Sequence, residues 1–198
     1  MPSTYTSNEL KCEVLCLGFL FVSACSSGGG PPFAEIRWQL RCPTGLTGCF
    51  ADQPAHSIRN LDGEDGHLIR CSVQKIEDQR QRIDFRAFHG ADYGIEVTNL
   101  VIPKGGGPVM GAGCRIRVDD DSVSYGGLDS GVCGANPPTG PDFPCQIQSV
   151  QAGKELSGTI LCSSLSAPAA PTTLRRDFSS PDSPGTPASF RFLNCDGL

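Results

Sequence analysis

The chain has 198 residues with a formal net charge of -5 and a sequence pI near 5.1, and 38% of its residues are hydrophobic. This composition fits one globular domain with its own core, and it excludes a disordered chain or one that spans a membrane throughout. The acidic balance, without any Lys/Arg run longer than two residues, argues against a nucleic-acid partner, because proteins that read phosphates carry a basic face.

The first element along the chain is an apolar stretch at residues 14–24, VLCLGFLFVSA, which is followed by the polar run CSSGGGPP. About eleven apolar residues suit the hydrophobic region of a secretory leader and fall short of the roughly 20 that a transmembrane helix needs. The Ser, Gly and Pro residues after Cys25 are typical of a flexible tether.

The four residues Val22-Ser23-Ala24-Cys25 resemble the lipobox of bacterial lipoprotein signal peptides. The resemblance implies that signal peptidase II removes residues 1–24, that Cys25 is lipidated and acylated (palmitate), and that residues 25–32 form the lipidated tether. Ser26 resembles a sorting signal for the outer membrane of a Gram-negative envelope, facing the periplasm or the cell surface. Two or three acyl chains anchor a protein stably in a bilayer where one would not. The alternative is a buried N-terminal strand in which Cys25 is structural.

Residues 33–198 are predicted to form a single domain of short strands. In FAEIRWQLRC, Ile36, Trp38, Leu40 and Cys42 share one face, and the polar residues Glu35, Arg37, Gln39 and Arg41 share the other. The same period of two marks a half-buried strand in HLIRCSVQKI, RIDFRAF, YGIEVTNLVI and CRIRVDDDSVSY, and further strands are expected in CQIQSV, ELSGTILC and SFRFLNC. The best helical candidate, residues 73–85, supports one turn at most.

Eight or nine strands with Gly/Pro turns predict an all-β fold, an antiparallel β-sandwich that is jelly-roll-like and stapled by disulfides. A small closed β-barrel is the alternative, because sequence patterns do not show closure. Two long loops are expected, at residues 126–144 and 163–188, where Gly, Pro, Ser and Ala dominate.

The chain has 11 cysteines, a high count for a reducing compartment. Without the three that lie at or before residue 25, an even number remains, which predicts four disulfides. The candidates are Cys42, Cys49, Cys71, Cys114, Cys133, Cys145, Cys162 and Cys195. Local spacing favours the pairs Cys42–Cys49, Cys71–Cys114, Cys133–Cys145 and Cys162–Cys195, one of about 105 possible connectivities.

No residue pattern predicts a catalytic site. The histidines, His56, His67 and His89, have no zinc-ligand spacing and are interpreted as solvated loop residues, and no G-x-S-x-G elbow is present. NLDGEDG at residues 60–66 departs from the EF-hand pattern where that pattern is strict. The run Asp119-Asp120-Asp121 is a weak calcium candidate, and Tyr125 is the one loop aromatic with a claim to ligand binding. No cofactor is expected.

These observations together predict a lipid-anchored cell-envelope protein with a binding or structural role and no enzyme activity. Its expected partners are the lipid bilayer, through acylated Cys25, and an envelope protein or glycan. A calcium- or glycan-binding surface module is the first alternative. A secreted hydrolase assembled from scattered loop residues is the second, and a cluster of His, Asp and Ser side chains in one concave site would favour it.

Overall fold

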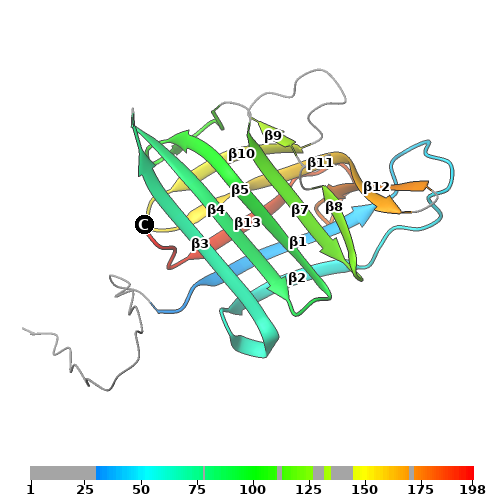
Figure 1. Ribbon diagram of the computed structural model, residues 1–198, viewed down its shortest axis with the longest axis horizontal. Helices are drawn as coiled ribbons and strands as arrows, with labels where there is room; N and C mark the ends of the chain where they lie inside the picture. Colours follow the sequence, from blue (N-terminus) through cyan, green and yellow to red (C-terminus); the bar gives the residue numbers. More distant parts are fainter. Residues whose placement is uncertain (1–29, 78, 111–112, 127–131, 135–144, 170–171) are drawn as a thin grey trace, which may run out of the picture.

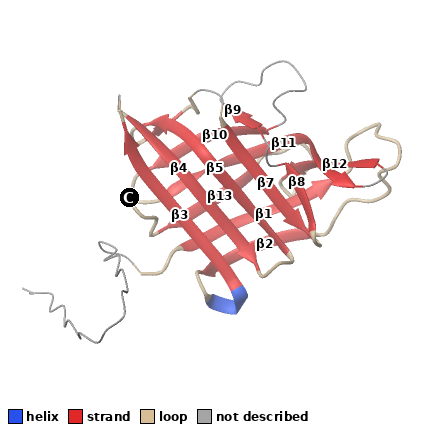
Figure 2. Cartoon of the chain, in the orientation of Figure 1, coloured by secondary structure: helices blue, strands red, loops and turns tan. Residues whose placement is uncertain are grey.

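A computed structural model describes residues 30–77, 79–110, 113–126, 132–134, 145–169 and 172–198. Within these residues the chain is built from strands, and the one helical segment is the 3-10 turn Glu64–Gly66 (Figure 2). The strands are β1 (Phe33–Arg41), β2 (Ala55–Leu61), β3 (His67–Ile76), β4 (Arg80–His89), β5 (Tyr93–Pro103), β6 (Gly106–Gly107), β7 (Cys114–Asp120), β8 (Val123–Gly126), β9 (Val132–Gly134), β10 (Cys145–Ala152), β11 (Leu156–Ala169), β12 (Thr172–Ser179) and β13 (Ala188–Leu193).

The strands form two packed sheets, which confirms the predicted antiparallel sandwich. The front sheet has the order β3-β4-β5-β7, with β8 on the far side of β7. The back sheet has the order β2-β1-β13-β11-β10, and β12 lies in line with β13 between β1 and β11. The short strand β9 joins the sheets, because it pairs antiparallel with β7 and parallel with β10. The predicted alternative, a closed barrel, is wrong, since β2 and β3 are not paired along the opposite side.

The front strands cross the back strands steeply rather than running along them (Figure 1). As a result, β2 at the lower edge of the back sheet runs beneath one end of several front strands. That end comprises the start of β3, the end of β4, the start of β5 and the end of β7. This crossing decides which residues meet along the edge of the sandwich.

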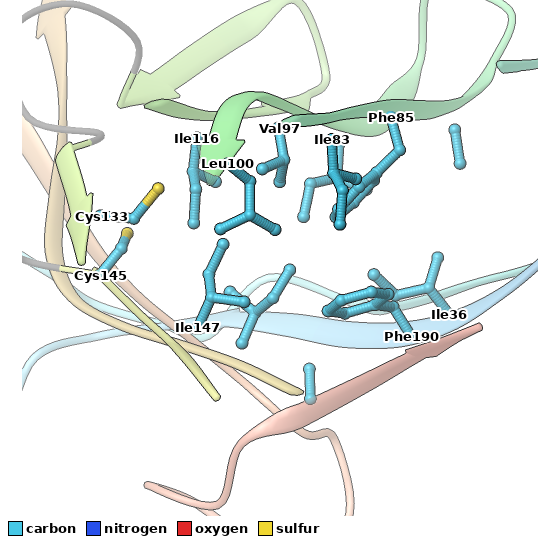
Figure 3. Close-up of a cluster of buried hydrophobic side chains, with 14 of the residues drawn as sticks. Ile36, Ile83, Phe85, Val97, Leu100, Ile116, Cys133, Cys145, Ile147 and Phe190 are labelled. Carbon is cyan, nitrogen blue, oxygen red and sulfur yellow. The ribbon is translucent and has the colours of Figure 1, made fainter. Parts of the chain in front are cut away.

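The core fills the space between the sheets, as the alternation in the sequence predicts. Side chains of the front sheet point toward those of the back sheet: Ile83, Phe85, Val97, Leu100 and Ile116 above, and Ile36, Ile147 and Phe190 below (Figure 3). The ring of Phe85 lies 4.9 Å from that of Phe190 and 4.8 Å from that of Phe192, measured between centroids. Trp38 is fully buried, as predicted.

One sequence prediction of local structure is wrong, and one strand was missed. Residues 73–85, for which the sequence allowed one helical turn at most, contain no helix within the described part; they include the end of β3 and the start of β4, which pair as a hairpin. Residues 163–188 are not one long loop, because β11 continues to Ala169 and β12 pairs with it. The strand β2 was missed, and only part of the predicted loop 126–144 is described, including β9.

All eight predicted disulfide cysteines are bonded. The pairs are Cys42–Cys49, Cys71–Cys195, Cys114–Cys133 and Cys145–Cys162. The predicted pairing Cys42–Cys49 is confirmed and the other three predicted pairings are wrong. The physical reason is the register. Four cysteines lie side by side across β7, β9, β10 and β11, and the two disulfides among them join directly opposed residues of antiparallel neighbours. Cys71 instead meets Cys195, because the C-terminal segment runs beside β3 and Ser72 bridges Asp196.

Candidate functional site

The predicted lipidation residue, Cys25, and the leader of residues 1–24 lie outside the described residues, as does most of the tether. The described chain enters the sandwich through Pro31 and Pro32, whose carbonyl oxygens accept hydrogen bonds from Asn194 Nδ2 and from the Asp62 N–H. From there, β1 carries the chain to Arg41 at the opposite end, about 30 Å away at about 3.3 Å per residue. The disulfide loop between Cys42 and Cys49 therefore lies at the end remote from the tether (Figure 1).

The three histidines lie together, which sequence reasoning missed. They are strand residues rather than loop residues: His56 is in β2, His67 begins β3 and His89 ends β4. Their rings form a row with Tyr93, with centroid separations of 4.9 Å for His67–His89, 5.0 Å for His89–Tyr93 and 4.4 Å for Tyr93–His56. We call this row the histidine seam. The steep crossing of the sheets creates it, because β2 passes beneath the ends of β3, β4 and β5.

The inner end of the seam is a hydrogen bond between His56 and the buried Asp120. His56 Nε2 lies 3.0 Å from Asp120 Oδ1, and the His56 ring packs 5.5 Å from that of Trp38. Asp120 has 4% of its surface exposed, and its second oxygen, Oδ2, has no hydrogen-bond partner among the described residues. Burial raises the pKa of Asp120, and the adjacent His56 opposes that rise.

The seam does not complete a hydrolytic triad within the described residues. His56 forms its hydrogen bond with Asp120, and no serine or threonine hydroxyl is bonded to its ring. Tyr125, the predicted binding aromatic, is not on the surface: it is 2% exposed and sits in β8 facing the core. Burial raises the pKa of its phenol. That prediction is wrong because Tyr125 pairs with Val118, whose side chain faces inward.

The weak calcium candidate is not supported. Asp119 and Asp120 are neighbours at the end of β7 and point to opposite faces of the sheet. Asp119 binds Arg117 at 2.8 Å on the outside, whereas Asp120 binds His56 on the inside. Asp121 follows the strand at positive φ, in the turn. The described residues contain no group of three or more His, Cys, Asp or Glu that could hold a metal ion.

The outer face of the front sheet carries a shallow depression of about 240 Å³. The side chains that point outward around it come from three strands and from the C-terminal segment, which lies beside β3 in Figure 1. They are Arg70, Ser72, Asp84, Arg86, Glu96, Thr98 and Asp196. We call this the outer-face depression, and it is the candidate binding site of the described surface.

Most charged groups around the outer-face depression already have partners. Arg70 binds Asp62, the Arg117 guanidinium lies 3.7 Å from Glu96, and Asp84 Oδ1 accepts the N–H of Asn99 at 2.7 Å. For Asp62, burial alone would raise the pKa, but the Ile69 N–H and the charges of Arg70 and Arg86 outweigh it and lower the pKa. Arg86 itself has no hydrogen bond or ion pair within the described part of the chain.

Searches of protein-family models, curated proteins and solved structures found no match to this chain. Among the described residues, none belongs to a helix that is long and apolar enough to cross a membrane.

Proposed function

We propose that this protein is a lipid-anchored component of a bacterial cell envelope, held at the outer membrane by acylated Cys25, with a binding role and no catalytic site. The observation that carries this proposal is the pairing of the cysteines in the domain. All eight cysteines after Cys25 are paired with one another, so Cys25 has no disulfide partner left inside the domain. A cysteine that receives a diacylglycerol must be free in this way.

The disulfides also support the compartment. Four disulfides in one small domain fit an oxidising environment such as the periplasm or the cell surface, and they are rare in a reducing cytosol. The tether composition and the position of Pro31 agree with an anchor at one end of β1. The domain would then hold its remote disulfide loop away from the membrane.

A binding role is favoured over a hydrolytic one by the two candidate sites. The His56–Asp120 pair lies between the sheets and lacks a bonded hydroxyl among the described residues, whereas the outer-face depression is open and polar. The glycan-binding alternative gains support from the same depression. The calcium-binding alternative has no comparable support in the described residues.

The intact mass of the protein purified from its native membrane tests the anchor and the disulfides together. The expected mass is that of residues 25–198 plus two or three acyl chains, with no thiol open to alkylation before reduction and eight after it. The matched control is Cys25→Ser, which should leave the leader attached and add no lipid while the eight cysteines stay paired. A lipid-free chain that keeps residues 1–24 and alkylates without reductant would overturn the proposal.

A further inference from the structure

The row of residues that crosses the outer-face depression places two arginines side by side. Arg70 of β3 is directly opposite Arg86 of β4, and Arg86 is directly opposite Glu96 of β5. Directly opposed residues of antiparallel strands share a face and lie about 5 Å apart at their Cβ atoms. Like charges in such a pair destabilise a sheet, so this pair costs stability unless another group neutralises it.

Among the described residues, no carboxylate is bonded to Arg86. Asp62 forms an ion pair with the Arg70 guanidinium. Its interaction with Arg86 is electrostatic only, without a hydrogen bond. Glu96, although opposite Arg86, lies within ion-pair distance of Arg117 on the next strand. Within the described residues, the guanidinium of Arg86 thus keeps its hydrogen-bond donors free. A free guanidinium presents a planar fork that matches a carboxylate with two parallel hydrogen bonds.

The hydroxyls and carboxylates around Arg86 indicate which class of anionic ligand the depression can bind. Ser72 and Thr98 carry hydroxyls that form no hydrogen bond within the described residues, and the carboxylates of Asp84, Glu96 and Asp196 also line the depression. Phosphate would place all of its charge close to these three carboxylates and be repelled by them, whereas the single charge of a uronate can lie at Arg86 with its uncharged hydroxyls at the carboxylates. A sugar ring that bears one carboxylate offers an acceptor to Arg86 and hydroxyl donors to the acidic side chains.

The size of the depression agrees with this ligand. Its volume of about 240 Å³ is below the about 300–1,000 Å³ of pockets that enclose drug-sized molecules. The site has room for one monosaccharide unit on an open surface. An open surface also suits a chain that continues beyond the bound unit.

We infer that the outer-face depression binds a uronic-acid unit of an acidic glycan, with Arg86 holding the sugar carboxylate and the neighbouring hydroxyls and carboxylates holding the ring. This inference rests on the proposed binding role of the domain and names its ligand class. Ser72, Asp84 and Thr98 lie within the same depression and are the expected partners of the ring hydroxyls.

The test is a calorimetric titration of the purified full chain with an oligogalacturonide, and with a neutral glucose oligomer and sodium sulfate as parallel probes. The oligogalacturonide should bind, and Arg86→Gln should weaken it about tenfold or more, because a charge-assisted bidentate contact is lost. The matched control is Arg59→Gln on β2 of the back sheet, an exposed arginine paired with Glu35 at 3.5 Å, which should leave the affinity unchanged.

Three outcomes would overturn the inference. The first is that the oligogalacturonide does not bind, and the second is that the neutral oligomer binds equally well. The third is that sulfate binds as tightly as the oligogalacturonide and that Arg86→Gln abolishes both to the same extent, which would mean that Arg86 holds a simple anion. The emission of Trp38, the single and fully buried tryptophan, establishes that each variant is folded. Failure here leaves the lipid anchor untouched, because the mass at Cys25 tests that separately.

Discussion

At the scale of single residues, Asp120 combines a titratable carboxyl group with nearly complete burial. Its carboxylate is 4% exposed, one oxygen binds His56, and the other has no partner among the described residues. A buried carboxylate with an unfilled lone pair favours the protonated form, which is why burial raises its pKa. Stability and pH are therefore linked through this residue.

The raised pKa fixes the sign of that link. The folded chain binds the Asp120 proton more tightly than the unfolded chain does, so the stability it contributes is full below the unfolded pKa and is lost as pH rises through the folded pKa. We expect the free energy of unfolding of Asp120→Asn to fall furthest below that of the native chain near pH 3. The difference should become progressively smaller at higher pH. Urea unfolding at several pH values, followed by Trp38 emission, measures the difference. A difference that grows with pH would contradict this.

Asp62 gives the dependence of stability on pH the opposite sign. Its pKa is lowered, although burial opposes this, because the Ile69 N–H donates to Oδ1 at 2.8 Å and Arg70 binds Oδ2. Its contribution is present above the unfolded pKa and is lost as pH falls through the folded pKa. We expect Asp62→Ala to cost about 1 kcal/mol at neutral pH, the usual value of such a hydrogen bond, and little in strong acid. Equal losses at pH 7 and pH 2 in the same urea assay would refute the assignment.

At the scale of elements, each sheet contains a glycine covered by a phenylalanine from the neighbouring strand. Gly94 of β5 is opposite Phe88 of β4, and Gly158 of β11 is opposite Phe190 of β13. A Cβ on Gly94 would overlap the Phe88 ring and lie 2.7 Å from the Ala87 carbonyl oxygen. A Cβ on Gly158 would lie 2.7 Å from the Phe190 ring. Both rings occupy the space that a side chain would fill.

We expect Gly94→Ala to lower the free energy of unfolding by about 1–3 kcal/mol, the usual cost of overpacking, because a carbonyl oxygen cannot move aside as a side chain can. Gly153→Ala is the matched control, since nothing lies within 4 Å of its added Cβ and its φ is ordinary. Thermal unfolding of both variants compares them directly. If Gly153→Ala is destabilised as much as Gly94→Ala, the steric argument is wrong.

The elements that alternate strongly were predictable from sequence, and those that do not were missed. Strands β1, β3, β4 and β7 carry apolar residues at every second position, and these face the core as expected. In β5 the alternation is present on both sides of Asn99, where it shifts by one residue. The edge strand β2 buries only Ile58 fully, so its pattern is weak. In β12, Arg176 is nearly buried beside Phe178, and the Ser/Pro/Ala composition around it obscured the strand.

The candidate sites depend on contacts that sequence patterns do not contain. His56, His67 and His89 lie far apart along the chain and meet only because the two sheets cross steeply. The outer-face depression depends on register, which sets Arg70 against Arg86. The pairing of the cysteines is equally hard to predict from sequence. Their even number predicts four disulfides, but it does not say which residues pair. Several pairings are close in space in the row of Cys114, Cys133, Cys145 and Cys162.

At the scale of the whole molecule, the disulfides hold the sandwich together at very different ranges. Cys71–Cys195 joins β3 to the C-terminal segment across 124 residues, at the side where the two sheets share no strand pairing. The adjoining segment adds backbone hydrogen bonds, from the Val73 N–H to the Asp196 carbonyl and from the Asp196 N–H to the Cys71 carbonyl. Cys42–Cys49, by contrast, closes a surface loop of 7 residues.

Chain entropy predicts that these two bonds contribute unequally to stability. The loss on closing a loop grows with the logarithm of its length, which gives about 5 kcal/mol for the long loop and about 2 kcal/mol for the short one. We expect the double variant Cys71→Ser/Cys195→Ser to lose at least twice the free energy of unfolding lost by Cys42→Ser/Cys49→Ser. Urea denaturation of both double variants under oxidising conditions measures the ratio. Equal losses would mean that the C-terminal hydrogen bonds, rather than the covalent link, close that side of the sandwich.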